Sequence, residues 1–436
     1  MTAAPLVSRL FLYTAIAAAV AGVAVPHRAS AASFYLQDQS VKGLGRAYSG
    51  EVSDQGAESL WWNPAAIAGS PNEIYVGENS ILTNATVHDL GSSVTYPGGA
   101  SASTDGDPHA YKPVLFGVVP NAAISHRIGD RFAVGLSTAA PYDFTTKYSA
   151  DSFARYDSLK SRLTTLDIAA TGAMRVTSWL DLGVSVNTEY TSAYLSDALP
   201  LFVKGLPDEE EALHGEGWNV GYTVGGQAHF GRWEFGASYK SAMEHTLAGG
   251  AVVSSLLSPT AASTIKLGAK AHFTTPWTAT FGARYHLTSR LTLDAQVERF
   301  GWNRFNAISY VVAGSTSSVP EVYHDTTSGA IGLDYAVDKR LTFRAGVGYD
   351  QSPLNPTYRD TRIPDSDRML YTLGASMKVM PNLTLDASGG YVAFKSSTVN
   401  NSTAFYSGTA LQTTVREFAG IGANAKVLSL GLRYYY

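Results

Sequence analysis

Residues that could carry out chemistry are scattered along this 436-residue chain, and they form no known catalytic motif. The sequence contains no G-x-S-x-G, H-E-x-x-H, P-loop or complete G-x-G-x-x-G. The chain has no cysteine, and none of its ten histidines is followed by another four residues later. We therefore predict a protein that is not an enzyme and that has no cofactor and no bound metal. A hydrolase triad assembled from distant residues is the enzymatic alternative.

The sequence does contain residues suited to binding an apolar ligand. Two segments between predicted strands are unusually hydrophobic for surfaces that face water. Exposed apolar patches usually mark interaction sites, so we predict that these segments bind an apolar ligand. The alternative is that the two segments pack on each other as a cap. The residues expected to bind it are Leu199, Leu201, Phe202, Val203 and Leu206 in one segment and Val252, Val253, Leu256 and Leu257 in the other.

Composition narrows the class of protein. The chain is 45% apolar but only 16% charged, against about 25% charged residues in soluble domains. Its formal charge is −4, and it has no basic cluster that could serve as an electrostatic footprint for nucleic acid. These values make a soluble enzyme the weaker interpretation and exclude a disordered chain.

The N-terminus has the features of a targeting segment. Arg9 precedes an apolar run from Leu10 to Val25, and Ala29-Ser30-Ala31 gives a small-residue cleavage site. This arrangement predicts a secretory signal peptide over residues 1–31, with an uncleaved anchor as the alternative. No later segment has 18 consecutive apolar residues, so a membrane role would have to use strands.

From residue 73 onward, apolar residues alternate with polar residues or glycine, which predicts strands with one apolar face. Short turns alternate with long connections along the whole series. This pattern predicts an all-β fold, a 14-stranded antiparallel transmembrane β-barrel over residues 73–436 in the outer membrane of a Gram-negative bacterium. A pair of soluble β-sandwiches is the alternative. The predicted strands are 73–83, 113–126, 132–144, 161–176, 180–195, 218–230, 233–243, 263–287, 291–302, 325–335, 341–350, 368–379, 383–394 and 413–436.

Aromatic residues near the strand ends suit the two interfaces of a membrane. The last strand ends in Tyr434-Tyr435-Tyr436, and we expect the barrel-assembly machinery to bind this aromatic strand. Outer-membrane lipid and lipopolysaccharide would surround the barrel. Nothing in the sequence suggests a trimer, so we expect a monomer.

Residues 32–72 fit no strand pattern and carry several large aromatic residues, including Phe34, Trp61 and Trp62. A free periplasmic tail would be more charged and less aromatic. A 14-stranded barrel is too wide for its own side chains to fill. We therefore predict that this segment is a plug inside the lumen.

At this point the residues carry a family resemblance. The run that contains Gly43, Gly45 and Arg46, followed by Asn63-Pro64-Ala65, resembles the N-terminal hatch of the FadL-type family of long-chain fatty acid and aromatic hydrocarbon transporters. Further similarity lies in Ala140-Pro141-Tyr142, Gly217-Trp218-Asn219 and the run 363–368. The resemblance implies a 14-stranded barrel closed by a hatch, in agreement with the strand count.

The resemblance also implies a transport path. In the family, two long loops form an outer hydrophobic groove, and a kink in the third strand opens the wall beside the hatch. Pro141 is the candidate for this kink, because a proline inside a strand removes a ladder donor. Termination of the strand at the rim is the alternative, and Pro120 and Pro276 also interrupt predicted strands.

The expected function is passive transport of hydrophobic small molecules, with long-chain fatty acids first and aromatic hydrocarbons or alkanes as the alternative. An adhesin or receptor barrel without transport is the alternative from another class. A fatty acid carboxylate would favour an arginine among the inward-facing charged residues, although these are more often ion pairs between plug and wall. Asp365 and Asp367 could contact calcium, but two loop carboxylates are more often solvated. The inward-facing charged residues are Asp167, Arg175, Asp181, Arg284, Asp294, Glu298, Arg344 and Asp386.

Overall fold

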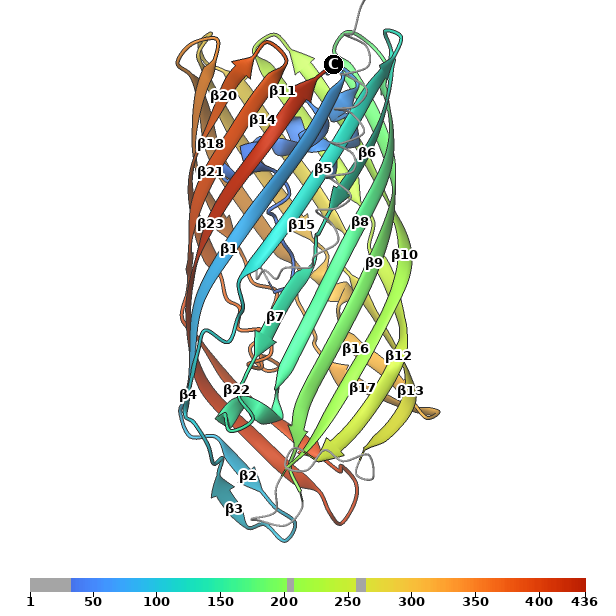
Figure 1. Cartoon of the computed structure of the whole chain (residues 1–436), viewed down its shortest axis with the longest axis vertical. Helices are drawn as coiled ribbons and strands as arrows, with labels where there is room; N and C mark the ends of the chain where they lie inside the picture. Colours follow the sequence, from blue (N-terminus) through green and yellow to red (C-terminus); the bar gives the residue numbers. More distant parts are fainter. Residues whose placement is uncertain (1–32, 202–207, 256–263) are drawn as a thin grey trace, which may run out of the picture.

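A computed structural model describes residues 33–201, 208–255 and 264–436, so the predicted signal peptide lies outside the described residues. Within these ranges, fourteen antiparallel wall strands close into a barrel, because β1 pairs with β23 from Glu73↔Tyr435 to Asp89↔Ala419 (Figure 1). The wall strands are β1 (Glu73–Asp89), β5 (Gly117–Ile128), β6 (Phe132–Ala139) continued by β7 (Asp143–Lys147), β8 (Lys160–Arg175), β9 (Leu180–Leu199), β10 (Glu209–Phe230), β11 (Trp233–Lys240) continued by β12 (Met243–Ser255), β13 (Ile265–Thr275) continued by β14 (Thr278–His286), β15 (Leu291–Phe300), β18 (Thr326–Ala336), β19 (Leu341–Asp350), β20 (Arg368–Met380), β21 (Leu383–Phe394) and β23 (Thr413–Tyr435). Each predicted strand is therefore present.

The two ends of the barrel differ. Short turns and the C-terminus lie at one end, which is the top in Figure 1, and long connections lie at the other. Several of the long connections contain structure of their own, which single-strand periodicity does not detect. These elements are β2 (Ser93–Thr95), β3 (Ser101–Ser103), β4 (His109–Tyr111), η4 (Phe153–Tyr156), η6 (Trp302–Arg304), β16 (Ala307–Val312), β17 (Ser315–Pro320) and β22 (Ser397–Phe405).

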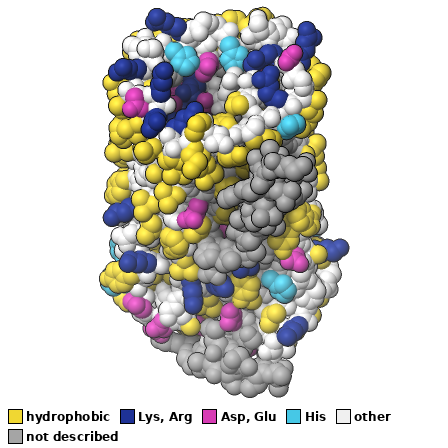
Figure 2. All heavy atoms as spheres, turned by 45° about the horizontal axis from the view of Figure 1, so that its top comes forward, with side chains coloured by type: hydrophobic (Ala, Val, Ile, Leu, Met, Phe, Trp, Pro, Cys, Tyr) yellow, Lys and Arg dark blue, Asp and Glu magenta, His cyan; other side chains and the backbone are white. Residues whose placement is uncertain are grey.

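The alternation predicted from the sequence places apolar side chains outside and polar side chains inside. On β9, Val184 and Val186 are 50% and 54% exposed, whereas Asp181 is fully buried. Figure 2 shows hydrophobic side chains gathered in a broad zone of the face in view, with more charged side chains towards the two ends. In the part of the chain that the structure describes, no helix is both long and apolar enough to span a membrane.

Two expected loops are shorter than predicted because the strands beside them are longer. Leu199 is the last residue of β9, β10 already begins at Glu209, and Val252 and Val253 lie in β12. The assignment of these three residues to loops was therefore wrong. The strands continue because β10 keeps its backbone hydrogen bonds to β9 and β12 as far as Glu209. This pairing extends beyond the part of the wall whose outer face must be apolar. Phe202, Val203, Leu206, Leu256 and Leu257 lie outside the described residues.

Residues 33–72, which we call the N-terminal segment, contain only short helices. These are α2 (Val41–Leu44), η1 (Glu51–Ser53), η2 (Ala57–Trp61) and η3 (Pro64–Ile67). Leu36, Val41 and Ile67 are fully buried, and Val52 and Leu44 likewise have no exposed surface. Figure 1 shows these helices within the outline of the barrel, towards the end that carries the C-terminus. The segment is thus packed against the wall along most of its length.

Candidate functional site

The third wall strand is interrupted between β6 and β7. On the neighbouring strand β8, Asp167 pairs with Ala139, the last residue of β6, and Thr164 pairs with Asp143, the first residue of β7. The three residues 140–142 therefore lie opposite only two residues of β8, 165 and 166. An extra residue on one strand is a β-bulge, which bends that strand. The predicted kink residues Ala140, Pro141 and Tyr142 are the three residues of this interruption.

On its other side, the interrupted strand separates from β5. Ladder pairing between β5 and β6 stops at Ala122↔Thr138. It resumes only near the outer end, where the Leu115 amide donates to the Thr145 carbonyl at 3.1 Å. Among the described residues, β5 residues 117–121 therefore share no ladder pair with residues 139–143. We call this unpaired stretch of wall the strand-3 gap.

The N-terminal segment hydrogen-bonds to the edge that the gap leaves free. The Leu36 amide donates to the Pro141 carbonyl at 2.8 Å, and the Asp143 amide donates to the Phe34 carbonyl at 3.1 Å. The Gln39 side chain exchanges two hydrogen bonds with the Ala140 backbone, at 2.9 and 3.1 Å. Residues 34–39 thus replace the missing neighbour of the interrupted strand.

The Asn63-Pro64-Ala65 motif opens η3, which packs against β8, β9 and β10 and also contacts β5 and β6. Asn63 caps η3 by accepting a hydrogen bond from the Ala65 amide at 3.0 Å, and Pro64 occupies the first turn. Its side-chain amide donates to the Val52 carbonyl at 2.7 Å and to the Gly226 carbonyl of β10 at 3.0 Å. One side chain therefore ties two turns of the segment to the wall.

Wall glycines make this close approach possible. A Cβ at Gly183 on β9 would lie 2.4 Å from the Pro64 carbonyl carbon, and a Cβ at Gly225 on β10 would lie 2.2 Å from the Asn63 Oδ1. Any larger residue at Gly183 would push against backbone. Glycine is needed here because the backbone of the segment lies directly on the wall.

The Gly43–Gly50 motif forms a compact turn on the far wall. A Cβ at Gly45 would meet Ser388 Oγ at 3.0 Å, and a Cβ at Gly43 would meet Glu51 Oε1 at 2.9 Å. Ala47 and Tyr48 both adopt left-handed backbone conformations, with φ of 54° and 62°. Such conformations cost about 1–3 kcal/mol each in non-glycine residues and gather at functional sites.

Arg46 is fully buried at the centre of an ion network. Its guanidinium contacts Glu51 and Asp54 at 2.6 Å each and Asp334 of β18 at 3.0 Å. Arg284 of β14 contacts Asp54 at 2.6 Å and Asp334 at 2.9 Å. Burial alone would raise the pKa of the Asp54 carboxyl, but the charges of Arg284, Lys42 and Arg46 hold that pKa well below its usual value. We call Lys42, Arg46, Glu51, Asp54, Arg284, Asp294, Asp334 and Arg344 the buried ion network.

The structure places most of the predicted inward-facing charges on the buried side of the wall. Arg284, Asp294 and Arg344 join the buried ion network. Asp386 pairs with Arg433 at 2.7 Å, and Arg175 pairs with Asp181 at 3.1 Å. The other two engage neutral partners: Asp167 accepts from Asn187, and Glu298 accepts from Gln296.

Two cavities meet the N-terminal segment. The outer cavity, with an empty volume of about 1180 Å³ including its open mouth, lies towards the long connections. Its apolar lining includes Leu195, Leu213, Leu247, Phe273 and, on the segment, Phe34. Leu199, Leu201, Val252 and Val253 do not line it. The charged side chains of its lining are the bases Arg162, Lys270 and Arg362 and the acids Asp197, Glu211 and Glu321.

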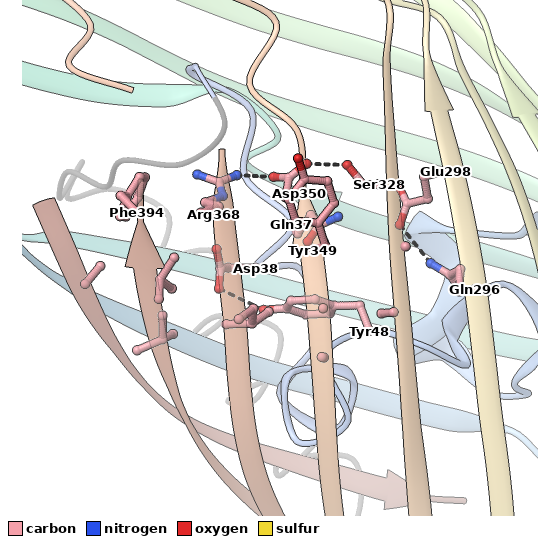
Figure 3. A pocket seen from close by; sticks show the side chains of 18 of the residues that line it. Gln37, Asp38, Tyr48, Gln296, Glu298, Ser328, Tyr349, Asp350, Arg368 and Phe394 are labelled. Carbon is pink, nitrogen blue, oxygen red and sulfur yellow. Dashed lines mark hydrogen bonds and ion pairs between the residues drawn. The ribbon is translucent and has the colours of Figure 1, made fainter. Parts of the chain in front are cut away.

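The inner cavity lies between the segment and the wall from β15 to β1, and its empty volume is about 670 Å³ (Figure 3). Its apolar surface comes from side chains such as Ile81, Leu370, Val392 and Phe394. Its charged lining residues are Asp38, Glu298, Asp350 and Arg368. Gln37 and Asp38 belong to the stretch that hydrogen-bonds to the strand-3 gap, so this stretch separates the inner cavity from the opening in the ladder.

Sequence reasoning missed an aromatic cluster that surrounds Phe34. The Phe34 ring lies 5.2 Å from Trp302, 5.0 Å from Phe305 and 5.7 Å from Tyr142. Trp302 was predicted as the last residue of strand 291–302, but β15 ends at Phe300 and Trp302 belongs to the long connection that follows. Phe305 and Tyr323 lie in the part of this connection for which no strand was predicted, and only its aromatic content could have signalled a buried role. Among the described residues, no group of three or more histidine, aspartate or glutamate side chains could hold a metal ion.

Comparisons with known proteins agree with this architecture. A family model described as outer membrane protein transport protein (OMPP1/FadL/TodX) matches residues 22–436. Outer membrane protein P1 of Haemophilus influenzae is 26% identical over 406 residues, covering 84% of this chain and 87% of the relative. The long-chain fatty acid transport protein of Escherichia coli K12 is 25% identical over 444 residues, covering 90% of this chain and 95% of the relative.

Solved structures show the same fold. A Pseudomonas aeruginosa FadL homologue superposes with a TM-score of 0.80 at 22% identity, covering 92% of this chain and 99% of the homologue. The Ralstonia pickettii toluene transporter TbuX gives a TM-score of 0.60 at 20% identity, covering 87% of this chain and 94% of the transporter.

Proposed function

This chain belongs to the family of outer membrane transport proteins described as OMPP1/FadL/TodX, and from that membership we propose a route for its ligand. The family transports hydrophobic molecules across the outer membrane, and its members are channels rather than enzymes. In our proposal the ligand enters the outer cavity, passes to the inner cavity and leaves through the strand-3 gap. The N-terminal segment acts as the plug, and residues 34–39 are the part that moves.

The observation that carries this proposal is the pairing of residues 34–39 with the interrupted third strand. A complete barrel wall has no free edge, because every strand is paired on both sides. Here the place of the missing wall strand is taken by residues 34–39 of the N-terminal segment, which are held by the Leu36, Asp143 and Gln39 hydrogen bonds described above. Displacement of this stretch would open the wall sideways without breaking any strand-to-strand ladder.

The outer cavity supports capture from water. Transfer of apolar surface out of water contributes about 25 cal/mol per Å², so a long acyl chain gains several kcal/mol in an apolar pocket. The lining of the outer cavity has as many bases as acids, and its bases Arg162, Lys270 and Arg362 would lie close to the head group of an entering ligand. Phe34 lines this cavity, and thus a bound ligand would touch the stretch that also holds the strand-3 gap closed.

Long-chain fatty acids are the first ligand class in this proposal, and aromatic hydrocarbons or alkanes are the alternative on the same path. The apolar lining of the outer cavity suits both classes, and its three bases favour a ligand with a carboxyl group. Relatives named for fatty acid transport and for toluene transport both resemble this chain.

In the cell, we place the protein as a monomer among outer-membrane lipid and lipopolysaccharide. We further propose that the barrel-assembly machinery recognises the aromatic end of the chain, where Tyr434 and Tyr435 close β23 and Tyr436 follows it.

The test is uptake of labelled oleate by cells that lack their own fatty acid transporter, with heat-modifiable gel mobility as the check for a folded barrel. We expect saturable uptake, with labelled toluene as the parallel ligand. A folded barrel that takes up neither ligand would contradict the proposal and favour a receptor without transport. In a receptor, deletion of residues 32–50 would leave ligand or partner binding intact, whereas in our proposal it abolishes the saturable uptake of oleate.

A further inference from the structure

We infer that the inner cavity binds head groups that are uncharged and donate a hydrogen bond, namely alcohols, phenols or protonated carboxylic acids, and disfavours the carboxylate anion. This inference rests on the proposed function, because it names the ligand form that passes from the outer cavity to the strand-3 gap. It concerns four side chains that are each more than nine-tenths buried.

The first argument is the charge balance of the lining. The inner cavity has three carboxylates, on Asp38, Glu298 and Asp350, and one guanidinium, on Arg368, so its formal balance is −2. Arg368 is already engaged, since it donates to Asp350 and lies 3.9 Å from Asp365. An anionic head group in this cavity would meet three carboxylates, and the one cation among the lining residues is already paired.

The second argument is the count of unused acceptors. Asp38 accepts one hydrogen bond at Oδ1, from the Tyr48 hydroxyl at 2.7 Å, and Glu298 accepts one at Oε1, from the Gln296 amide at 2.8 Å. No other described residue donates a hydrogen bond to the second oxygen of Asp38 or of Glu298. Figure 3 shows Asp38 and Glu298 on the two sides of the labelled Tyr48 ring. A donor on the ligand would satisfy an oxygen that the protein leaves unpaired.

The electrostatics of Asp38 point the same way. Burial raises the pKa of this carboxyl, and the charge of Asp350 adds to the effect, while the Tyr48 hydrogen bond and Arg368 oppose it. The net direction means that negative charge is already unfavourable at this position. A further anion would be less favourable still, whereas a neutral donor adds no charge.

The two cavities therefore differ in the ligand form that they suit. The outer cavity has three bases and three acids in its lining, and it can accept an anion from water. The inner cavity has one base and three acids. A fatty acid would thus be captured in either form, but would move inward as the protonated acid.

The lipid-facing side of the gap carries another carboxylate. Glu78 is exposed on the outer face of β1 and pairs in register with Pro120 of β5, which borders the strand-3 gap. Along β1, Ile74 pairs with Tyr434, and Leu82 pairs with Lys426, which in turn pairs with Tyr391. Glu78 therefore lies midway between the levels of these two tyrosines. Its Oε1 accepts a hydrogen bond from Ser80 at 2.7 Å. A ligand that enters the bilayer here again meets an acceptor of hydrogen bonds.

The absence of cysteine from the sequence gives a clean test. Ala330→Cys places a single thiol in the lining of the inner cavity, and Ala271→Cys places one in the outer cavity. The measurement is the concentration of oleyl alcohol, oleate or methyl oleate that halves the rate of thiol modification in folded protein at about pH 8. For Ala330→Cys we expect oleyl alcohol to protect at about tenfold lower concentration than oleate, with methyl oleate weaker than the alcohol. For Ala271→Cys we expect the alcohol and oleate to protect alike.

The charge itself is tested by Asp38→Asn with Glu298→Gln in the Ala330→Cys background. Both amides keep the shape of the side chain, and we expect oleate to protect at about tenfold lower concentration than before. Asp197→Asn is the matched control, because it removes a carboxylate from the outer cavity only. Equal protection by alcohol and oleate in Ala330→Cys, or an oleate value unchanged by the double variant, would overturn the inference.

Failure of the proposed function gives a different result. If neither thiol is protected by any ligand and cells take up no oleate, then the transport path itself is wrong. If uptake and Ala271→Cys protection occur while Ala330→Cys shows no preference for the alcohol, then only the present inference is wrong.

Discussion

The N-terminal segment is attached to the barrel in two unlike ways. Residues 34–39 are held on the third strand by a few backbone hydrogen bonds, one glutamine side chain and the contacts of the Phe34 and Tyr35 rings with Tyr142. Residues 42–54 are held on the far wall by the buried ion network, in which Arg46 alone contacts three carboxylates. The first attachment resembles strand pairing, whereas the second depends on buried ion pairs between the segment and the wall.

This difference separates a part that can move from a part that anchors it. A backbone hydrogen bond contributes only about 0.5–1.5 kcal/mol net, because water can replace either partner. A buried charge that loses its partner costs about 3–5 kcal/mol. Ligand binding near Phe34 can therefore shift residues 34–39, while the ion network keeps the rest of the segment in place.

The largest expected effect comes from the anchor. Arg46→Met should destabilise the packed segment by about 3–5 kcal/mol, because buried Glu51 loses the one ion-pair partner it has among the described residues, and Asp54 and Asp334 each lose one of their cations. Proteolysis of the segment in a folded barrel and single-channel ion conductance should both rise. Arg299→Met is the matched control, because Arg299 is an exposed arginine that lies 3.6 Å from Asp325. If the two variants conduct alike, the ion network is not the anchor.

A steric change at the wall should have the next largest effect. Gly183→Ala places a methyl group 2.4 Å from the Pro64 backbone, and the overpacking should cost about 1–3 kcal/mol. Protease sensitivity of the segment is the measurement. Gly172→Ala, on the neighbouring strand β8, has no atom within 4 Å of the new Cβ and serves as the control. Equal protease resistance in both variants would argue against close packing of η3 on the wall.

Loss of the Asn63 side chain should destabilise the segment less than either of these changes. Asn63→Ala removes the cap of η3 and two hydrogen bonds to carbonyls, which costs about 1–2 kcal/mol. We expect slower oleate uptake by a barrel that still shows heat-modifiable mobility. Asn84→Ala changes an exposed asparagine of β1 and should leave uptake unchanged. Wild-type uptake by a folded Asn63→Ala barrel would refute the expectation.

The movable attachment should respond in the opposite direction. Gln39→Ala removes both side-chain hydrogen bonds to Ala140, about 1 kcal/mol, and should make uptake faster because the gap is held less tightly. Initial uptake rates at low ligand concentration are the measurement. Gln55→Ala is the control, since that side chain does not contact the third strand. Slower uptake by Gln39→Ala would mean that this contact guides the ligand rather than blocking it.

The smallest expected effect is a pH dependence of the outer cavity. Burial raises the pKa of Glu321 from 4.5 to about 8, the charge of Asp360 adds to this, and Arg362 opposes it. Because the folded pKa lies above the unfolded value, the stability contributed by neutral Glu321 is complete below about pH 4.5 and is lost as the pH rises through about 8. Ionisation also adds a negative charge to the outer cavity.

We therefore expect oleate to protect the Ala271→Cys thiol less well at pH 9 than at pH 7, by a few fold. In a Glu321→Gln background the protection should be the same at both values. Protection of the Ala271→Cys thiol that is equal at pH 7 and pH 9 when Glu321 is retained would show that Glu321 does not face the bound head group.

The wall could be predicted from the sequence because its determinants are local. Side chains of a strand alternate with a period of two, as in Leu291, Leu293 and Ala295, and the lengths of the connections are visible directly. These two signals predicted fourteen strands and their antiparallel order. The Asn63-Pro64-Ala65 motif and Pro141 were also visible, since a proline inside a strand has one clear consequence for the ladder.

What only the tertiary structure decided is the content of the lumen. Asp38 and Glu298 line one cavity although 260 residues separate them in the chain. Gln39 meets Ala140 of the third strand across 101 residues, and Arg46 meets Asp334 across 288 residues. Periodicity shows that such a side chain points inward, but the partner across the lumen depends on barrel closure and on where the segment settles. Strand identity is fixed by neighbours in the chain, whereas the ligand path is fixed by neighbours in space.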